Sequence, residues 1–218
     1  MLALVRTRIG LLSPQKSCST GILPEDSTGT LVGPGSDEGT PPEYRSGFGR
    51  EGTDALKAFV QKGGTLVTLG GASSFAIEKF ALKVRNVTVT AAKPATPPLP
   101  PAPPPFWCPG STLKVKFENA KPLAYGMPAE GLVVFMRGCP AFEIVPSDHN
   151  ERYETVVRYA DRDLLESGWL IGEETLAKKA ALVSAQLGQG RVVLIGFRCQ
   201  HRAQTHGTFK LLFNALLR

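Results

Sequence analysis

The last thirty residues constrain the fold of this chain more than any other segment. Residues 187–191 (LGQGR) predict a hairpin-type turn, and residues 192–196 (VVLIG) are apolar on both faces, like a strand covered by helices. A polar loop follows. A helix is predicted from about Thr208, because apolar side chains recur there at i, i+3, i+4 and i+7. We expect this stripe to face the core: Phe209, Leu212, Phe213 and Leu216.

Residues 53–90 predict a second α/β unit. Thr53 or Asp54 can cap a helix that ends at Gly63 and Gly64, and residues 65–69 (TLVTL) follow as a short buried strand. A further helix is predicted at about residues 74–80. Residues 84–90 alternate apolar with polar side chains, which predicts a strand with one solvated face. The pattern is that of an α/β protein.

Short β-prone runs between residues 111 and 186 predict a mixed or antiparallel extension of this sheet. Turn-forming residues separate the four runs, which are residues 113–117, 132–136, 155–159 and 181–186. The domain boundaries follow from composition. Residues 1–49 are rich in Gly, Pro, Ser and Thr and predict an irregular, largely disordered segment, whereas residues 50–218 predict one α/β domain.

A proline-rich loop at residues 93–105 interrupts this domain. Proline lacks the donor N–H and fixes φ, so the run must be stiff and extended rather than helix or central strand. A lengthened surface loop accounts for it more simply than a polyproline ligand for an aromatic-lined groove.

Composition and charge exclude several classes of function. The formal net charge is +6, but Lys and Arg are scattered and no basic run reaches five residues, so we expect no nucleic-acid partner. No apolar segment is long enough to span a membrane. We therefore expect no membrane partner for this chain. Arginines interrupt the apolar N-terminal residues, which is unlike a secretory signal, and the compartment stays open.

The loop that leads into the C-terminal helix is the densest polar cluster in the chain. It leaves the carboxyl end of a buried strand and enters a helix N-terminus, a geometry that favours anions. We expect a small anionic or carbohydrate ligand there, held by Arg198, His201, Arg202, Gln204 and His206. The alternative is that these side chains cap the helix and pair with acids on neighbouring loops.

No complete catalytic motif accompanies this loop. The chain has three histidines, and a metal site built on His201 and His206 needs an acidic ligand from elsewhere, so no metal or cofactor is expected. None of the four cysteines lies in a Gly-x-Cys-x-Gly elbow. The nearest serine version is residues 71–75, around Ser73. A hydrolase that pairs Ser73 or Cys199 with His201 or His206 stays open, as does a helix-capping role for Ser73 or Ser74.

Six stretches form a long, ordered pattern: PPEY (41–44), ALKAFVQKGGTLVTLG (55–70), FWCPGS (106–111), PLAYGMP (122–128), SGWL (167–170) and residues 190–217. Together they resemble the C-terminal domain of bacterial zinc carboxypeptidase-like proteins. The resemblance covers about residues 40 to 218. It implies a class I glutamine amidotransferase-like fold, that is, a flavodoxin-like three-layer α/β sandwich, with residues 22–26 as an altered remnant of an earlier strand.

Two departures from this family shape the functional hypothesis. The peptidase domain with its zinc-binding residues has no counterpart here, so the resemblance carries over no catalytic residue and no metal ligand. The N-terminus of the flavodoxin-like sandwich is also incomplete. We therefore expect a non-catalytic accessory or binding domain, with a peptidase domain or a second chain as a partner. The alternatives are the serine or cysteine hydrolase and a truncated fragment without independent function.

Overall fold

A computed structural model describes residues 20–23, 49–89, 105–146 and 153–217. Most of the predicted irregular segment, most of the proline-rich loop and His149 lie outside these residues. The helices are α1 (Gly49–Gln61), α2 (Ala72–Lys79) and α3 (His206–Leu216). The strands are β1 (Thr20–Leu23), β2 (Thr65–Leu69), β3 (Val84–Asn86), β4 (Gly110–Phe117), β5 (Glu130–Met136), β6 (Phe142–Ile144), β7 (Tyr153–Tyr159), β8 (Leu165–Ser167), β9 (Ala180–Leu187) and β10 (Gly190–Ile195).

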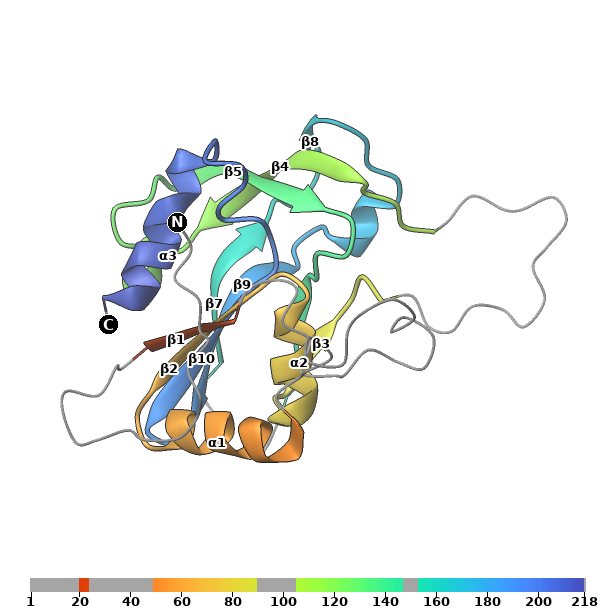
Figure 1. Cartoon of the computed structure of the whole chain (residues 1–218). Coiled ribbons are helices and arrows are strands. Elements are labelled where there is room, and N and C mark those ends of the chain that lie inside the picture. Colours follow the sequence, from red (N-terminus) through yellow and green to blue (C-terminus); the bar gives the residue numbers. More distant parts are fainter. Residues whose placement is uncertain (1–19, 24–48, 90–104, 147–152, 218) are drawn as a thin grey trace, which may run out of the picture.

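The strands described form one mixed sheet, in the main order β1-β2-β10-β9-β7-β4-β5. The pairs β1–β2 and β2–β10 are parallel, and every pair from β10 onwards through β9, β7, β4 and β5 is antiparallel. Off this path, β3 pairs with β6, β6 also pairs with β9, and β8 pairs with β4. The sheet therefore combines a parallel α/β half with an antiparallel extension, as the sequence predicted (Figure 1).

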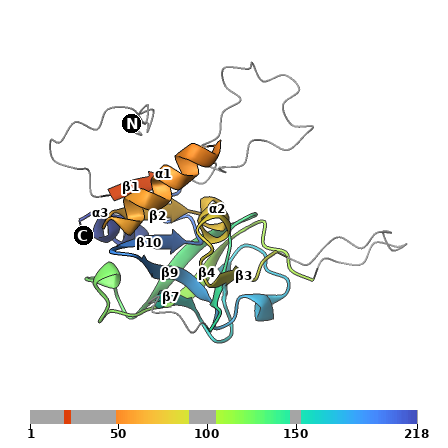
Figure 2. The same ribbon diagram turned by 90° about the horizontal axis from the view of Figure 1, so that it is seen from below.

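Helices lie on both faces of the parallel half. Alternate residues of a strand point to opposite faces, so the neighbours of each side chain identify the covering helix. Leu66 and Leu194 pack with α1 and α2 in one buried cluster, whereas Val67 and Ile195 pack with Leu211 of α3 in the other. The protein is thus an α/β protein with a three-layer, flavodoxin-like arrangement, and Figure 2 shows α1 and α2 together on one side of β2 and β10.

The connection from α1 to β2 follows the predicted plan with one change at its start. Helix α1 begins at Gly49, earlier than the predicted cap at Thr53 or Asp54, and the Thr53 hydroxyl donates to the Gly49 carbonyl. The helix ends before Gly63, whose φ of +109° favours glycine. A Cβ on Gly190 would come within 2.2 Å of the Gly64 carbonyl oxygen, so the turn before β10 approaches this helix end closely.

Two predicted strands differ from the observed ones. Strand β3 spans only Val84–Asn86 of the predicted residues 84–90, because the Asn86 side-chain oxygen accepts from both the backbone N–H and the hydroxyl of Thr88 and turns the chain. Strand β1 lies within the segment predicted to be irregular and overlaps the strand remnant proposed at residues 22–26. It forms the end of the sheet beside β2.

The apolar stripe predicted for the C-terminal helix matches the buried face of α3 only in part, since Leu212 packs against the core. The buried residues are Thr208, Leu211 and Ala215, while Phe213 is 55% exposed. The small Ala215 and Thr208 allow the helix to approach the sheet closely, and Leu211 fills the contact. Because apolar residues surround most of this helix, periodicity alone could not identify the side that faces the sheet.

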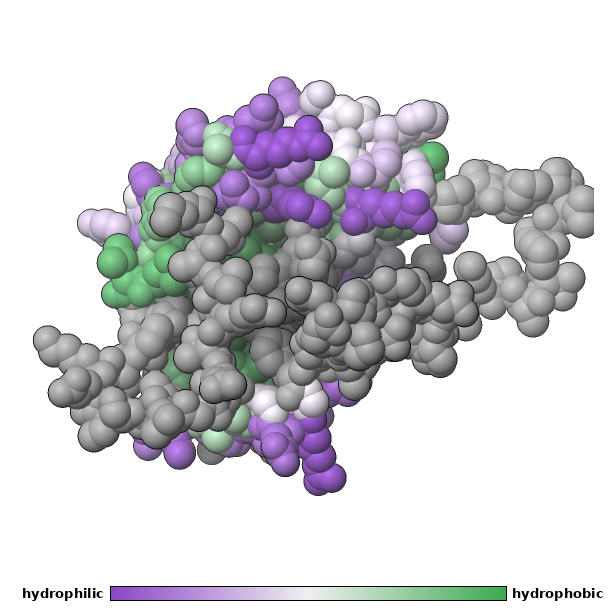
Figure 3. Space-filling view, in the orientation of Figure 1, coloured by the Kyte–Doolittle hydropathy of each residue, from purple (hydrophilic) through white to green (hydrophobic). Residues whose placement is uncertain are grey.

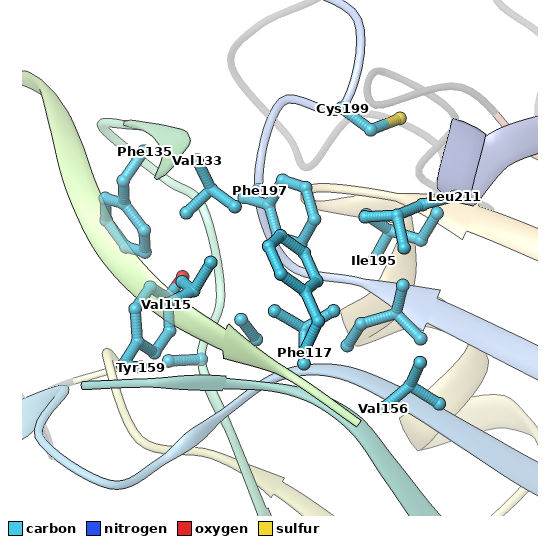
Figure 4. Packing of buried hydrophobic residues seen from close by; sticks show 14 of the residues in the cluster. Val115, Phe117, Val133, Phe135, Val156, Tyr159, Ile195, Phe197, Cys199 and Leu211 are labelled. Carbon is cyan, nitrogen blue, oxygen red and sulfur yellow. The ribbon is translucent and has the colours of Figure 1, made fainter. Parts of the chain in front are cut away.

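The larger core lies between α3 and the antiparallel extension. Figure 4 shows its side chains converging from β4, β5, β7, β10 and α3. The rings of Phe135 and Tyr159 meet edge to face with centroids 6.2 Å apart, and Phe106 meets Phe135 in the same way. This packing fixes β4 and β5 relative to the N-terminal end of α3, where the candidate site lies.

Candidate functional site

The loop between β10 and α3 is anchored by its backbone to two neighbouring strands. Gly196 N–H donates to the Ala181 carbonyl, and Arg198 N–H donates to the Val134 carbonyl of β5. A Cβ on Gly196 would lie 2.2 Å from the Pro140 carbonyl oxygen, so only glycine fits where the chain leaves β10. The loop therefore leaves the sheet in a fixed direction, beside β5.

Two threonines close the loop onto the start of α3. The Thr205 hydroxyl donates to the Cys199 carbonyl at 3.1 Å and accepts from the His201 N–H at 3.1 Å. The Thr208 hydroxyl donates to the same Cys199 carbonyl at 2.6 Å. Sequence reasoning missed both residues. The signal available was Thr at the N-cap of a predicted helix, although here the hydroxyls bind the loop and make no cap hydrogen bond.

The five predicted ligand residues take different positions on this loop. Arg198 and His201 are half-buried, whereas Arg202, Gln204 and His206 are exposed. Arg202 has a φ of +49°, in the left-handed region that few non-glycine residues occupy. The loop therefore turns sharply in its middle.

A groove of about 440 Å³ lies at the N-terminus of α3. One side is the start of the helix, residues 204–208, and the other side consists of β4, β5 and the segment between them. The β-sheet side is mainly apolar, with Phe117, Met127, Pro128, Leu132, Val133 and Val134. Of the predicted ligand residues, Gln204 and His206 line the groove, and Arg198, His201 and Arg202 lie outside its lining.

The polar edge of the groove is the first turn of α3. Backbone N–H groups at a helix N-terminus carry partial positive charge and are available to an anion. No acidic residue lies in this first turn. The His206 and Phe209 rings meet edge to face with their centroids 5.3 Å apart. This contact holds the imidazole at the N-terminus of α3. The site can hold a molecule with an apolar body and a polar or charged end.

The proposed nucleophiles are buried away from this groove. Ser73 is fully buried, and its hydroxyl lies 3.0 Å from the Thr68 hydroxyl in a hydrogen bond. Thr68 in turn donates to the Val193 carbonyl. Neither Ser73 nor Ser74 is the N-cap of α2, which is Gly71, so the predicted capping role is wrong. A hydroxyl enclosed in this way has no path to substrate.

The three cysteines that the structure describes are also core residues. Cys108, Cys139 and Cys199 are at most 3% exposed. Burial raises the pKa of the Cys108 thiol, and a hydrogen bond with Ser111 offsets part of this rise. A buried thiol with a raised pKa is a poor nucleophile. Cys199 contributes its backbone carbonyl to the threonine bonds of the loop and its side chain to the core.

The described residues contain no group of three or more His, Cys, Asp or Glu side chains that could hold a metal ion. Among the same residues, no helix is both long and apolar enough to cross a membrane.

Comparison with known proteins shows a likeness of structure only. No protein-family model matches the chain, and no curated protein matches it. A ThuA-like protein from Bacteroides uniformis is 15% identical with a TM-score of 0.43, over 78% of this chain and 63% of that one. A cytoplasmic protein from Salmonella typhimurium is 15% identical with a TM-score of 0.48, over 91% and 70%.

A β-galactosidase from Bacillus circulans is 13% identical with a TM-score of 0.45. The match covers 91% of this chain but 22% of the enzyme. The chain thus spans about a fifth of that enzyme and 63% of the ThuA-like protein. The class that the structure defines is an α/β protein with helices on both faces of a mixed sheet.

Proposed function

We propose that this chain is a non-catalytic accessory domain of the glutamine amidotransferase-like class that binds a small organic anion. The observation that carries the proposal is the groove of about 440 Å³, which joins an apolar wall to the N-terminus of α3. The apolar wall removes the ligand's carbon skeleton from water, while the helix N-terminus and His206 hold its charged end. The five loop residues predicted from the sequence thus divide into Gln204 and His206 at the groove and Arg198, His201 and Arg202 beside it.

The buried nucleophiles support binding rather than hydrolysis. A hydrolase needs its nucleophile within hydrogen-bond reach of a base and open to substrate. Ser73 bonds to Thr68 instead, and Cys199 is 1% exposed. The proposed relationship to zinc carboxypeptidase-like proteins is supported by the resemblance of the six sequence stretches. In this proposal the domain accompanies a peptidase domain or a second chain and does not cleave peptides itself.

Thermal unfolding of the purified chain tests the proposal. Benzoate, acetate, phosphate, neutral sugars and zinc chloride are added one at a time. We expect a cooperative transition. Benzoate should raise its Tm more than acetate does, because the apolar wall favours the larger carbon skeleton. Stabilisation by sugars alone would mean that the ligand is a carbohydrate rather than an anion. Stabilisation by zinc alone would indicate a metal site. If none of these compounds raises Tm, the proposal is overturned. A non-cooperative transition would favour the truncated fragment.

Matched variants locate the anion. His206→Ala should reduce the benzoate-induced rise in Tm by at least about half, since this side chain lines the groove. Gln200→Ala is the control, because Gln200 is an exposed residue of the same loop that does not line the groove. Arg202→Ala distinguishes the two parts of the predicted cluster. A loss of binding in Arg202→Ala with none in His206→Ala would place the anion at the arginines and contradict the groove.

A further inference from the structure

Strand β5 is the last strand on the main path of the sheet, and only one of its two edges is paired with another strand. That strand is β4, which pairs with β7 and β8 on its far side (Figure 1). At the outer edge of β5, the Arg198 N–H donates to the Val134 carbonyl at 2.9 Å, and the Cys139 N–H donates to the Met136 carbonyl. In the part of the chain that the structure describes, residues 130–132 have no strand beside them on this side. We call these three residues the open edge of β5.

The hydrogen bonds of β4 show which way the backbone of Leu132 points. Leu132 lies opposite Lys114, whose N–H donates to the Leu164 carbonyl and whose carbonyl accepts from the Ala160 N–H. Both backbone groups of Lys114 thus point away from β5. Opposed residues of an antiparallel ladder either exchange both hydrogen bonds or exchange none. The N–H and the carbonyl of Leu132 therefore point away from β4, and neither has a hydrogen-bond partner among the described residues.

The open edge of β5 adjoins the groove beside α3. Residues 131–134 line this groove together with residues 204–208 at the start of the helix. Leu132 is 45% exposed, and β5 carries neither proline nor lysine, which often protect sheet edges from pairing. A strand added here would continue the bridge between Arg198 and Val134 along β5, and the start of α3 would cover its other side.

The groove favours a single extended segment over the edge of another sheet. A second copy of β5 would bring its own β4 and neighbouring strands into a space whose opposite wall is the start of α3. Figure 3 shows mainly hydrophilic side chains over the upper part of the molecule, where β4, β5 and the loop before α3 lie in Figure 1. Such surroundings favour a short peptide, which binds a sheet edge through backbone hydrogen bonds and through pockets for alternate side chains.

We propose that the groove binds the C-terminal end of a peptide, which adds to the open edge of β5 as an extended strand. A peptide C-terminus combines the three groups that the groove matches. Its backbone pairs with the N–H and carbonyl of Leu132, its apolar side chains lie on Phe117 and Met127, and its carboxylate lies at the start of α3 beside His206. The inference deepens the proposed function and rests on it, because this carboxylate is the anion that the groove binds.

Fluorescence polarisation tests the proposal with the peptide Ala-Val-Ala-Val, labelled at its N-terminus and ending in a free carboxylate. We expect a Kd below about 1 mM, and weaker binding overturns the proposal. The same peptide with a C-terminal amide should bind at least about tenfold more weakly, because it lacks the charge that the helix N-terminus stabilises.

Two further peptides test the strand pairing on the unaltered protein. Each carries one N-methyl group, on one or the other of the two consecutive amides in the middle of the peptide. Successive N–H groups of a strand point to opposite edges, so the two affinities should differ by at least about tenfold. Equal affinities, whether strong or weak, overturn the pairing with β5.

A matched pair of variants tests the same hydrogen bonds from the protein side. Leu132→Pro removes the N–H at the open edge without removing a hydrogen bond to β4, and it should weaken peptide binding by at least about tenfold. Leu132→Ala keeps the N–H and should weaken binding by less. Circular dichroism checks that both variants are folded, and the methylated peptides decide the question if Leu132→Pro misfolds. Equal binding by the two folded variants contradicts the pairing.

The response to benzoate separates this inference from the proposed function. A rise in Tm with benzoate but no binding of the peptide overturns the inference and leaves the proposed function standing. Peptide binding that amidation does not weaken, with no response to benzoate, overturns the carboxylate site and the proposed function with it. Sedimentation equilibrium at about 100 µM tests for a second copy. A wild-type dimer that Leu132→Pro dissociates, without peptide binding, would place another β5 at the open edge and overturn the inference.

Discussion

The two faces of the parallel half of the sheet are covered unequally. On one face, α1 and α2 enclose Leu66, Val192 and Leu194 completely. On the other, α3 alone packs on Val67, Val193 and Ile195, and the antiparallel extension supplies the rest of the core. The second face has a groove at one end of α3, so a single helix that covers a broad face leaves its own margin open to binding.

The largest expected effect contrasts the two sides of α3. Leu211→Ala should lower the free energy of unfolding by about 2–5 kcal/mol, because Leu211 is 1% exposed and its loss leaves a cavity against the sheet. Phe213→Ala should cost below about 0.5 kcal/mol, because Phe213 is 55% exposed. Urea denaturation measures both. Equal losses would restore the stripe predicted from the sequence and contradict the observed orientation of α3.

A smaller effect is expected for the polar contact on the α1–α2 side. Ser73→Ala should cost about 1–2 kcal/mol, because it leaves the buried Thr68 hydroxyl with one partner fewer. Thermal unfolding measures the loss, and the benzoate-induced rise in Tm should not change, since Ser73 is remote from the groove. Ser74→Ala is a matched control on the exposed side of α2. A loss of ligand binding in Ser73→Ala alone would revive the hydrolase hypothesis.

The core on the α3 side contains a buried hydroxyl whose removal should not destabilise the protein, in contrast to that of Ser73. Tyr159 is fully buried, and its hydroxyl has no hydrogen-bond partner among the described residues. Burial, followed by the nearby Cys139 and Cys108, raises the pKa of Tyr159 well above its ordinary value. Tyr159→Phe removes an unsatisfied polar atom and keeps the ring contact with Phe135, so it should be neutral or stabilise by up to about 1 kcal/mol. Destabilisation above that size in urea would show that the hydroxyl has a partner.

The smallest effect concerns an ion pair at the margin of the sheet. Glu143 accepts hydrogen bonds from Lys179, at 2.7 Å, and from Arg85, and both partners lower its pKa below the ordinary value of 4.5. A lowered folded-state pKa contributes stability that is fully present above pH 4.5 and is lost as the pH falls through the folded value.

Glu143→Gln should therefore lower the free energy of unfolding by on the order of 1 kcal/mol or less at neutral pH, since the carboxylate is partly exposed. The difference from the wild type should shrink as the pH falls below 4.5, where the wild-type carboxylate becomes protonated. Thermal unfolding at a series of pH values measures it. A difference that stays constant across this range would mean that the ion pair contributes nothing and that the loss is steric.

The local sequence pattern was sufficient to predict those strands and turns that a glycine or a continuous apolar run specifies. The strand at β2 was predicted residue for residue, and the turn at Gly63 and the apolar run of β10 were located closely, because glycine torsions and continuous apolar runs leave few alternatives. Strand β1 was assigned to an irregular segment, since four residues without a strong pattern become a strand only when β2 offers them a parallel partner.

Part of the candidate site could likewise be predicted from the sequence, and part could not. The loop after β10 was identified from its polar residues and from its place between strand and helix, and Gln204 and His206 do line the groove. Thr205 and Thr208, which close the loop, and the apolar wall from β4 and β5 could not be identified, because those strands are far from the loop in sequence and meet it only through sheet pairing.

By itself, the sequence determined the alternation of helices and strands, the mixed character of the sheet and the absence of a complete catalytic motif, since each depends on neighbouring residues. Only the tertiary structure decided which side of α3 is buried, that Ser73 and Cys199 are enclosed, and that a groove lies between the start of α3 and the edge of β5. Burial is a property of packing between distant segments, and a helix with apolar residues on most of its sides does not specify which side packs.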